Sequence, residues 1–203
     1  MRAINIVTHC ATCEDLDERD LKRYNVCESH KEKSNVRSSE EDDLRKFVLN
    51  SKFNNYTLYD HYFWNYTIPQ ISKEFDLLRI GENSVINIEL KREANEDKIK
   101  KQLKQNNYYL KALNKQVYTF CYITCNNILY EYHSEDDSLQ IIKFDDLNIN
   151  LQNQEMLIDK GIDDMFEPSK FLVSPFNKMN EFLNDEYFLT DQQVNIKKIF
   201  YKY

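Results

Sequence analysis

The order of the predicted elements indicates an α/β fold, in which one β-sheet is flanked by helices. A helix start signal stands at residue 38, two β-forming runs meet at a short turn over 81–84, and an amphipathic helix follows from residue 95. Further strand patterns come after that helix. Chains that mix helices and strands in this way pack the helices against the faces of a sheet. With 203 residues and 41% hydrophobic side chains, the chain can bury one sizeable core.

The first helix is expected to begin at Ser38. Ser38 and Glu41 fit a capping box, in which the two side chains satisfy backbone groups of the first turn. Glu41 also shares a helical face with Leu44, so its carboxylate can instead point toward the sheet. Both interpretations of Glu41 stay open. The aromatic-rich residues 53–72 then predict a loop or an edge strand before Pro69.

Residues 74–91 predict a β-hairpin that brings charged side chains together. Two β-forming runs flank a Gly-Glu-Asn-Ser turn, and side chains two apart on a strand point to the same face. Glu89 and Lys91 should therefore project together, and Asp76 on the partner strand can converge with them. Two close carboxylates repel unless positive charge lies between them, and a divalent cation is the usual solution. A solvated hairpin face is the competing interpretation.

A capped helix is predicted after the hairpin. Asn95 can accept hydrogen bonds from the first turn, where two acidic residues suit the helix dipole. Gln102, Gln105 and Tyr109 lie beside the apolar stripe of this helix. The sequence does not decide between Gln102 and Gln105 as the residue that faces the hairpin, and an ordinary amphipathic helix would show a similar pattern. The stripe itself consists of Ile99, Leu103, Leu110 and Leu113.

Three strand patterns follow the helix. Residues 117–125 and 128–133 predict a strand pair joined at an Asn-Asn turn, and residues 139–144 predict a further short strand. Cys121 and Cys125 both fall on the first of these patterns at even spacing. They are therefore expected to be core positions of a strand.

The hairpin motif Asp76…Glu89-Leu90-Lys91 resembles the D…ExK core of the PD-(D/E)xK nuclease superfamily. The resemblance covers roughly residues 38–132. The segment from Gln105 to Tyr109 is similar to the Q-x-x-x-Y motif of the RecB-like branch, with Gln102 as an alternative register. This resemblance implies a restriction-endonuclease-like mixed β-sheet flanked by helices.

The resemblance also implies a role for each matched residue. Asp76 and Glu89 would hold Mg²⁺ or Mn²⁺, with Glu41 as a further carboxylate. Lys91 would orient the water that attacks a phosphodiester bond. Either glutamine, together with Tyr109, would position the substrate strand. The matched substrate residues are Gln102, Gln105 and Tyr109.

The N-terminal region predicts a short strand over residues 1–7 and then a small zinc-binding element. Its C-x2-C-x13-C-x2-H pattern supplies two ligand pairs, as a tetrahedral structural Zn²⁺ requires. His9 is a spare donor, and buried or idle thiols are the competing interpretation. The pattern is formed by Cys10, Cys13, Cys27 and His30.

Residues 154–203 form a third region with weaker periodicity. The segment Phe188-Leu189-Thr190-x-x-Gln193 resembles the short adenine-reading motif that precedes the P-loop of superfamily 1 helicases, and a plain amphipathic helix is the alternative. The expected organisation is a zinc element with a linker over 1–37, a nuclease core over 38–153, and an extension over 154–203 that leads toward a helicase domain.

Composition excludes several other classes of protein. Only two glycines occur, so a Walker A loop or a dinucleotide fingerprint has no place within these residues. A net charge of −7 argues against a protein that coats nucleic acid, although a local basic patch remains compatible with it. No apolar run has the length of a membrane span, so a cytoplasmic protein with no membrane partner is expected.

These patterns together predict a divalent-metal-dependent nuclease that acts on DNA. The expected setting is a nuclease–helicase used in antiphage defence or DNA repair. A catalytically inactive nuclease-fold module that binds nucleic acid or protein is the main alternative. A zinc-dependent protein-interaction domain is the second.

Overall fold

The computed structural model describes residues 1–17, 19–21, 23–24, 38–68, 73–157 and 161–166. The chain divides into two units, one formed by residues 1–66 and 75–159 and the other by residues 67–74 and 160–203. The predicted charged residues of the hairpin and of the helix after it all belong to the first unit. Cys27, His30 and the helicase-like motif at 188–193 lie outside the described residues.

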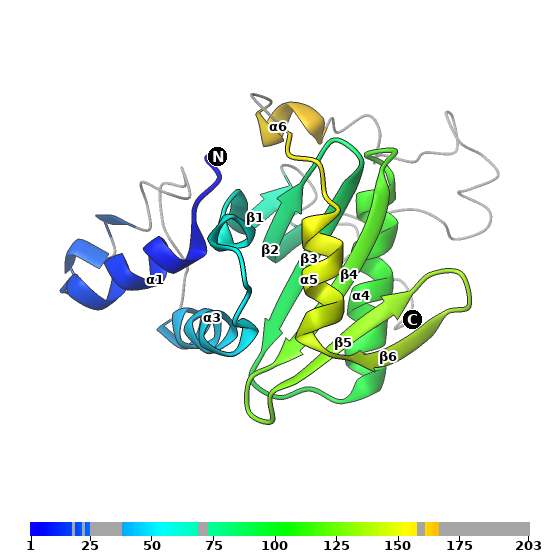
Figure 1. Ribbon diagram of the computed structural model, residues 1–203, viewed down its shortest axis with the longest axis horizontal. Helices are drawn as coiled ribbons and strands as arrows, with labels where there is room; N and C mark the ends of the chain where they lie inside the picture. The colour runs from blue at the N-terminus through cyan, green and yellow to red at the C-terminus, as the bar shows by residue number, and fades with distance from the viewer. Residues whose placement is uncertain (18, 22, 25–37, 69–72, 158–160, 167–203) are drawn as a thin grey trace, which may run out of the picture. The chain divides into compact units, whose positions relative to one another are not determined.

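A six-stranded mixed sheet forms the centre of the fold, in the order β1-β2-β3-β4-β5-β6 (Figure 1). β3 and β4 run parallel, whereas β2 with β3, β4 with β5 and β5 with β6 are antiparallel. The predicted α/β class with a mixed sheet and flanking helices is thereby confirmed. The strands are β1 (Tyr62–Ile68), β2 (Lys73–Ile80), β3 (Ser84–Lys91), β4 (Gln116–Ile123), β5 (Ile128–His133) and β6 (Ser138–Ile142).

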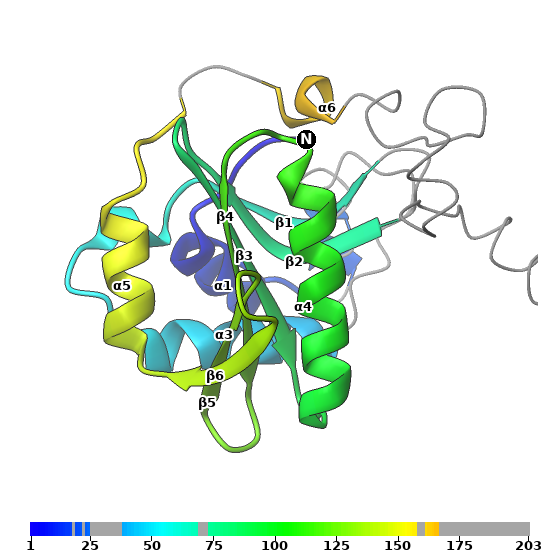
Figure 2. The same cartoon turned by 90° about the vertical axis from the view of Figure 1, so that its right-hand side faces the viewer.

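Helices cover both faces of the sheet. Parallel strands need a crossover connection, and α4 supplies it between β3 and β4. Figure 2 shows α4 on one side of the sheet and α5 on the other. The described helices are α1 (Ile6–Asp15), α3 (Ser38–Ser51), the 3-10 turn η1 (Tyr56–Tyr59), α4 (Glu96–Lys111), α5 (Phe144–Gln152) and α6 (Ile162–Met165).

The two faces of the sheet have separate apolar cores. On one face, residues of α1, α3 and α5 pack with alternate positions of β2, β3 and β4, including Ile86, Ile88 and Leu90. On the other face, Ile99 and Leu103 of α4 pack with Cys121 and Ile123 of β4. Because β3 is buried along almost its whole length, the side chains that alternate with its apolar residues lie beneath α4.

The start of α4 follows from its sequence. The Asn95 side chain accepts a hydrogen bond from the Lys98 backbone N–H at 3.0 Å, and Glu96 and Asp97 occupy the first turn. Both features favour a helix N-terminus at this point. The position of this cap, only a few residues after β3, places the first turns of α4 close to the end of that strand.

The predicted N-terminal strand is wrong. Helix α1 begins at Ile6, because the Asn5 side chain accepts hydrogen bonds from the Val7 and Thr8 backbone N–H groups at 3.1 and 3.0 Å. An Asn cap of this kind favours a helix over an extended segment with a similar apolar pattern. The extended pairing that remains is an isolated bridge between Ile4 and Tyr62.

Cys125 is not a core strand position. β4 ends at Ile123, and Cys125 is exposed in the turn before β5, whereas Cys121 is buried as expected. Within this turn Asn127 takes a positive φ of 59°, a conformation that Asn tolerates well. α5 was also not expected from the sequence. Among the described helices, none is both long and apolar enough to cross a membrane.

Candidate functional site

Strand pairing places Asp76 and Glu89 opposite each other. Leu77 of β2 pairs with Ile88 of β3 in the antiparallel register, and both are part of the core beneath α3. Asp76 and Glu89 are the next residues outward in this register, so their side chains point to the opposite face, the one that α4 covers. Lys91 lies two residues beyond Glu89 and projects to the same face.

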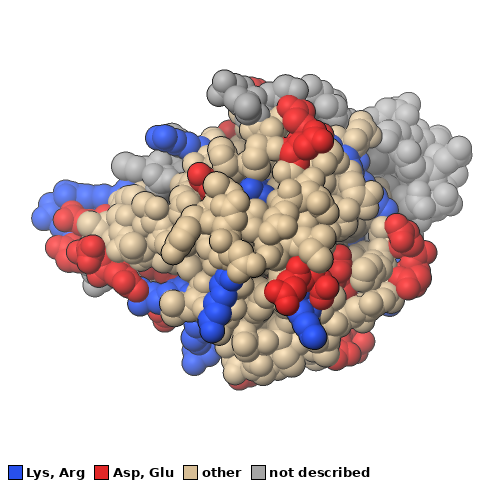
Figure 3. Space-filling view, viewed as in Figure 1, with Lys and Arg blue, Asp and Glu red and all other residues tan. Residues whose placement is uncertain are grey.

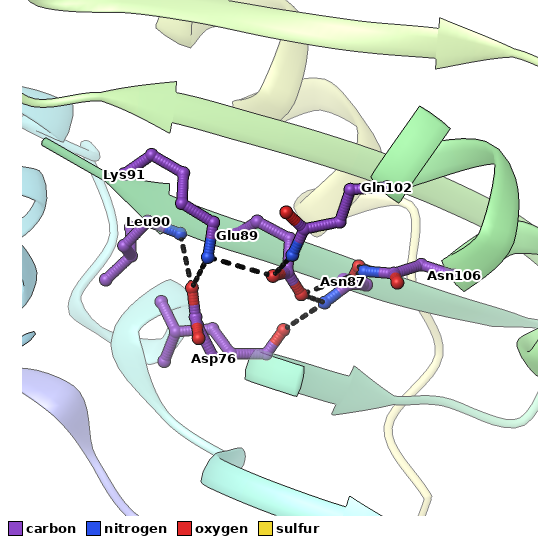
Figure 4. Close-up of polar contacts among 8 residues, drawn as sticks. Asp76, Asn87, Glu89, Leu90, Lys91, Gln102 and Asn106 are labelled. Carbon is purple, nitrogen blue, oxygen red and sulfur yellow. Dashed lines mark hydrogen bonds and ion pairs between the residues drawn. The ribbon is translucent and has the colours of Figure 1, made fainter. Parts of the chain in front are cut away.

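These three charged side chains meet around the Lys91 ammonium group (Figure 4). Lys91 Nζ lies 3.2 Å from Asp76 Oδ2 and 3.5 Å from Glu89 Oε2. The Leu90 backbone N–H also donates to Asp76 Oδ2, at 2.8 Å. The side chains of Asp76 and Lys91 are 20% and 32% exposed, while that of Glu89 is 2% exposed. The cluster is therefore open to a ligand from the side of Asp76 and Lys91.

The electrostatics of the cluster keep Lys91 charged. Burial alone would lower the pKa of Lys91, but the Asp76 and Glu89 carboxylates and the hydrogen bond to Asp76 outweigh this and raise it above its ordinary value. For the Cys121 thiol, whose charged form is an anion, burial has the opposite effect and raises the pKa, and the neighbouring Glu89 charge raises it further. Cys121 thus remains a neutral thiol beneath the site.

Amide side chains surround the Glu89 carboxylate. Gln102 of α4 donates to Oε2 through its Nε2. Asn106 of α4 donates to Oε1 at 2.9 Å, and Asn87 of β3 donates to the same oxygen at 3.1 Å. Figure 4 shows these amides approaching the carboxylate from the helix and from the strand.

The structure places Gln102, rather than Gln105, at the carboxylates. Gln105 is exposed, while Gln102 is half-buried against Glu89. Tyr109, the tyrosine of the predicted motif, is buried with 4% exposure. Because residues four apart share a helical face, the residue that accompanies Gln102 at the carboxylates is Asn106.

Sequence reasoning missed Asn87 and Asn106. Both are fully buried, and both contact Glu89 directly. Each had a positional signal: Asn87 precedes Glu89 by two residues on a strand, and Asn106 follows Gln102 by four on a helix. Neither position belongs to the D…ExK or the Q-x-x-x-Y motif, so the resemblance did not point to them.

Glu41 lies at the contact between α3 and α1. Its charge helps to raise the pKa of the Cys10 and Cys13 thiols on α1, after the larger effect of burial. Asp43, the next acidic residue on the buried side of α3, accepts a hydrogen bond from the Thr124 hydroxyl. The role expected for Glu41 beside Asp76 and Glu89 stays a prediction.

Cys10 and Cys13, which were expected in a zinc knuckle, lie on helix α1. Burial, the largest of several effects, raises the pKa of Cys10 to about 11 and that of Cys13 to about 12. The Cys13 sulfur lies 3.6 Å from His9 Nε2, so His9 is its described neighbour. The other half of the predicted zinc set, Cys27 and His30, lies outside the described residues.

The hairpin cluster has the donor chemistry of a hard-cation site. Mg²⁺ is usually held by one or two carboxylates, with water and phosphate oxygens completing its shell. Asp76 and Glu89 supply two carboxylates that converge on one positive group. Within the described part of the chain, no group of three or more His, Cys, Asp or Glu side chains is placed to hold a metal. Asp76 and Glu89 are the two side chains of the cluster with oxygen atoms of the kind that bind a hard cation.

Comparison of the chain with family models, with curated proteins and with solved structures found no match.

Proposed function

We propose that this protein hydrolyses phosphodiester bonds in nucleic acid, with DNA as the preferred substrate and Mg²⁺ or Mn²⁺ as the cofactor. The observation that carries the proposal is the meeting of Asp76, Glu89 and Lys91 on one sheet face. Two carboxylates and one ammonium group at this spacing suit a reaction in which negative charge develops on phosphate oxygens. The restriction-endonuclease-like identity of the sheet belongs to the same proposal.

Each residue of the cluster has a defined task in this mechanism. Asp76 and Glu89 would hold the cation, which supplies charge neutralisation at the phosphate and lowers the pKa of water. Lys91 is held charged by the two carboxylates and is partly exposed, so it can orient the attacking water or bind a phosphate oxygen. Gln102, which donates to the Glu89 carboxylate, would help to position the substrate strand beside it.

Residue patterns elsewhere in the chain suggest two further parts of this function. Cys10, Cys13, Cys27 and His30 would bind a structural Zn²⁺, and residues 154–203 would connect the nuclease to a superfamily 1 helicase. Antiphage defence or DNA repair in the cytoplasm is the proposed setting. These parts rest on residue patterns alone.

A cleavage assay tests the enzymatic proposal. The protein is incubated with linear and circular DNA, single- and double-stranded, and with RNA, in the presence of Mg²⁺, Mn²⁺ or EDTA. We expect cleavage with either metal and none with EDTA. Asp76→Asn and Lys91→Ala should each reduce the rate at least about 100-fold, because each removes a group that acts on the developing charge.

Lys101→Ala is the matched control for the lysine variant. Lys101 is exposed on α4 and lies outside the cluster, so its loss should leave the chemical step unchanged. Circular dichroism would show that all variants keep the fold. Full activity of a folded Asp76→Asn or Lys91→Ala variant would reject the proposed mechanism.

A second candidate is a nuclease-fold module that binds nucleic acid without cutting it. One observation favours it: the Lys91 ammonium forms ion pairs with both carboxylates, so part of their negative charge is offset without a metal. Retained DNA binding with no cleavage under any divalent metal would select this function.

A further inference from the structure

The Glu89 carboxylate is saturated by donors from the protein. A carboxylate offers about four lone-pair positions on its two oxygens. Asn87 and Asn106 donate to Oε1, at 3.1 and 2.9 Å, while Gln102 and Lys91 approach Oε2. A cation that binds Glu89 must therefore displace at least one of these donors.

The two asparagines at Oε1 are fixed in place. Asn87 Nδ2 donates both to Glu89 and to the Leu77 backbone carbonyl at 3.1 Å. Asn106 Nδ2 donates both to Glu89 and to Asn87 Oδ1 at 2.7 Å. Both N–H bonds of each amide are thus in use, and both residues have 0% exposure. Neither can leave Oε1 without breaking a second buried hydrogen bond.

The donors at Oε2 are held less firmly. Gln102 is half-buried, and the Lys91 side chain is 32% exposed. Both are long side chains with several rotatable bonds, so they can swing toward solvent at a cost far below that of moving a buried asparagine. Lys91 Nζ forms ion pairs with both Glu89 Oε2 and Asp76 Oδ2, so Oε2 is the Glu89 oxygen on the side of the second carboxylate.

We propose that Asn87 and Asn106 are positioning residues that lock Glu89 Oε1, so that Oε2 is the oxygen presented to a divalent cation, with Gln102 as the donor that the cation displaces. This inference rests on the proposed function, since it concerns the same carboxylate. It assigns opposite effects to two amides of one helix: Asn106 supports cation binding, whereas Gln102 competes with it.

A purely structural role for the asparagines is the alternative explanation, because any buried carboxylate needs partners. One feature of Asn106 points beyond it. Its Oδ1 is buried and has no hydrogen-bond partner among the described residues. Buried amide oxygens are nearly always satisfied. The orientation of Asn106 is therefore set by the two acceptors that its Nδ2 serves, Glu89 and Asn87.

The test measures Mn²⁺ binding directly, by isothermal titration calorimetry and by the Mn²⁺ electron paramagnetic resonance signal, in the absence of substrate. Asn106→Ala should weaken Mn²⁺ binding about 10- to 100-fold, as is typical when a group that orients a metal ligand is lost. Gln102→Met keeps the length of the side chain but removes the donor, so it should bind Mn²⁺ several-fold tighter than the wild type, and unchanged binding would count against the displacement of Gln102. Gln105→Met, on an exposed position of the same helix, is the matched control and should not change binding.

Each outcome decides the inference. Unchanged Mn²⁺ binding by a folded Asn106→Ala variant would overturn it, as would a 10-fold loss in Gln102→Met. If Asn106→Ala fails to fold, Gln102→Met alone still discriminates, because a merely structural contact predicts no gain in affinity. Absence of Mn²⁺ binding by the wild-type protein would instead overturn the proposed function, and this inference with it.

Discussion

Arg79 is a buried charge whose hydrogen-bond acceptors are neutral groups. It lies on β2 with 2% exposure, and burial lowers the pKa of its guanidinium against the opposing effects of Tyr62 and Asp60. Its nitrogens tie β2 to η1 and to the end of α5. The acceptors are the backbone carbonyls of Thr57, Asp60 and Leu151, the Gln154 side-chain oxygen and the Met156 sulfur.

Replacing this arginine should destabilise the fold strongly. Arg79→Met would leave several buried acceptors unsatisfied, at about 1–3 kcal/mol for each that water cannot reach. We expect the free energy of unfolding to fall by about 3 kcal/mol, measured by urea denaturation. Arg92→Met, at an exposed arginine, should change it by less than about 0.5 kcal/mol. Equal stability of the two variants would refute the assigned role of Arg79.

Asp137 should make stability depend on acid pH. Hydrogen bonds from Lys104, Tyr132 and Lys100 lower the pKa of Asp137 to about 2. Because the folded-state pKa lies below the unfolded value, the stabilisation is complete above about pH 4 and is lost as the pH falls toward 2. Asp137→Asn suits the same positive φ of 53° but cannot ionise. Its urea midpoint should therefore change less than that of the wild type between pH 5 and pH 2.5, and parallel curves would contradict this prediction.

At the scale of elements, α4 is the helix that positions two of the amide side chains of the site. It connects the parallel strands β3 and β4 and carries both Gln102 and Asn106. On another side of α4, Lys100 and Lys104 both form ion pairs with Asp137, at 3.2 and 2.9 Å. The amide contacts with Glu89 and the lysine contacts with Asp137 together favour one rotation of the helix about its axis. Any loosening of α4 should therefore move the amides away from Glu89.

The cap of α4 offers a test of this dependence. Asn95→Ala removes the acceptor for the Lys98 backbone N–H and should cost about 1 kcal/mol of unfolding free energy. Asn95→Asp keeps the acceptor and adds a favourable charge at the helix N-terminus, so it should keep the wild-type stability. Thermal unfolding of the three proteins would measure the effect. A loss of the same size in Asn95→Asp would show that the cap is not its cause.

The elements that sequence reasoning predicted well are those with strong local signals. The hairpin of β2 and β3 and the helix α4 have alternation, a turn and a cap within a few residues. The strand predicted over residues 1–7 is wrong because Asn5 acts as a helix cap inside an apolar run that also suits a strand. α5 has a short periodic pattern, and its burial depends on Leu147 and Leu151 reaching a core built from distant segments. Local patterns do not encode that packing.

At the scale of the whole molecule, the three charged residues of the site could be predicted from the sequence, but the contacts of the neighbouring amide side chains with Glu89 could not. Asp76, Glu89 and Lys91 follow from strand periodicity and one turn. The contact of Asn106 with Glu89 depends on the rotation of α4 over the sheet, which tertiary packing decides. The same applies to the choice of Gln102 over Gln105, since both lie near the edge of the apolar stripe.

The surface charge favours local rather than general binding of nucleic acid. Figure 3 shows acidic and basic side chains interspersed at the margins of one face, around a centre with few charges. The net charge of the chain is −7. If the protein binds DNA, the contacts should involve few phosphates, and the slope of log affinity against log salt should be correspondingly small.

Gly81 links the hairpin to the segment that follows α5. Its amide donates to Ser84 O at 2.8 Å, and it forms an isolated bridge with Met156. A Cβ at residue 81 would fall against the Glu155 carbonyl oxygen and 2.5 Å from Gln154 Cγ. No glycine among the described residues has a positive φ, so close approach, rather than backbone conformation, explains the glycine here.

Gly81→Ala should therefore detach or displace this segment. We expect the free energy of unfolding to fall by about 1–3 kcal/mol, as in other overpacked positions, with a lower urea midpoint. Gly161→Ala is the matched control, since the nearest atom to its new Cβ is a flexible Asp164 carboxylate oxygen at 3.1 Å. Because Gln154 also accepts a hydrogen bond from Arg79, Gly81→Ala and Arg79→Met should be non-additive. Strict additivity in the double variant would mean that the two residues stabilise the molecule independently.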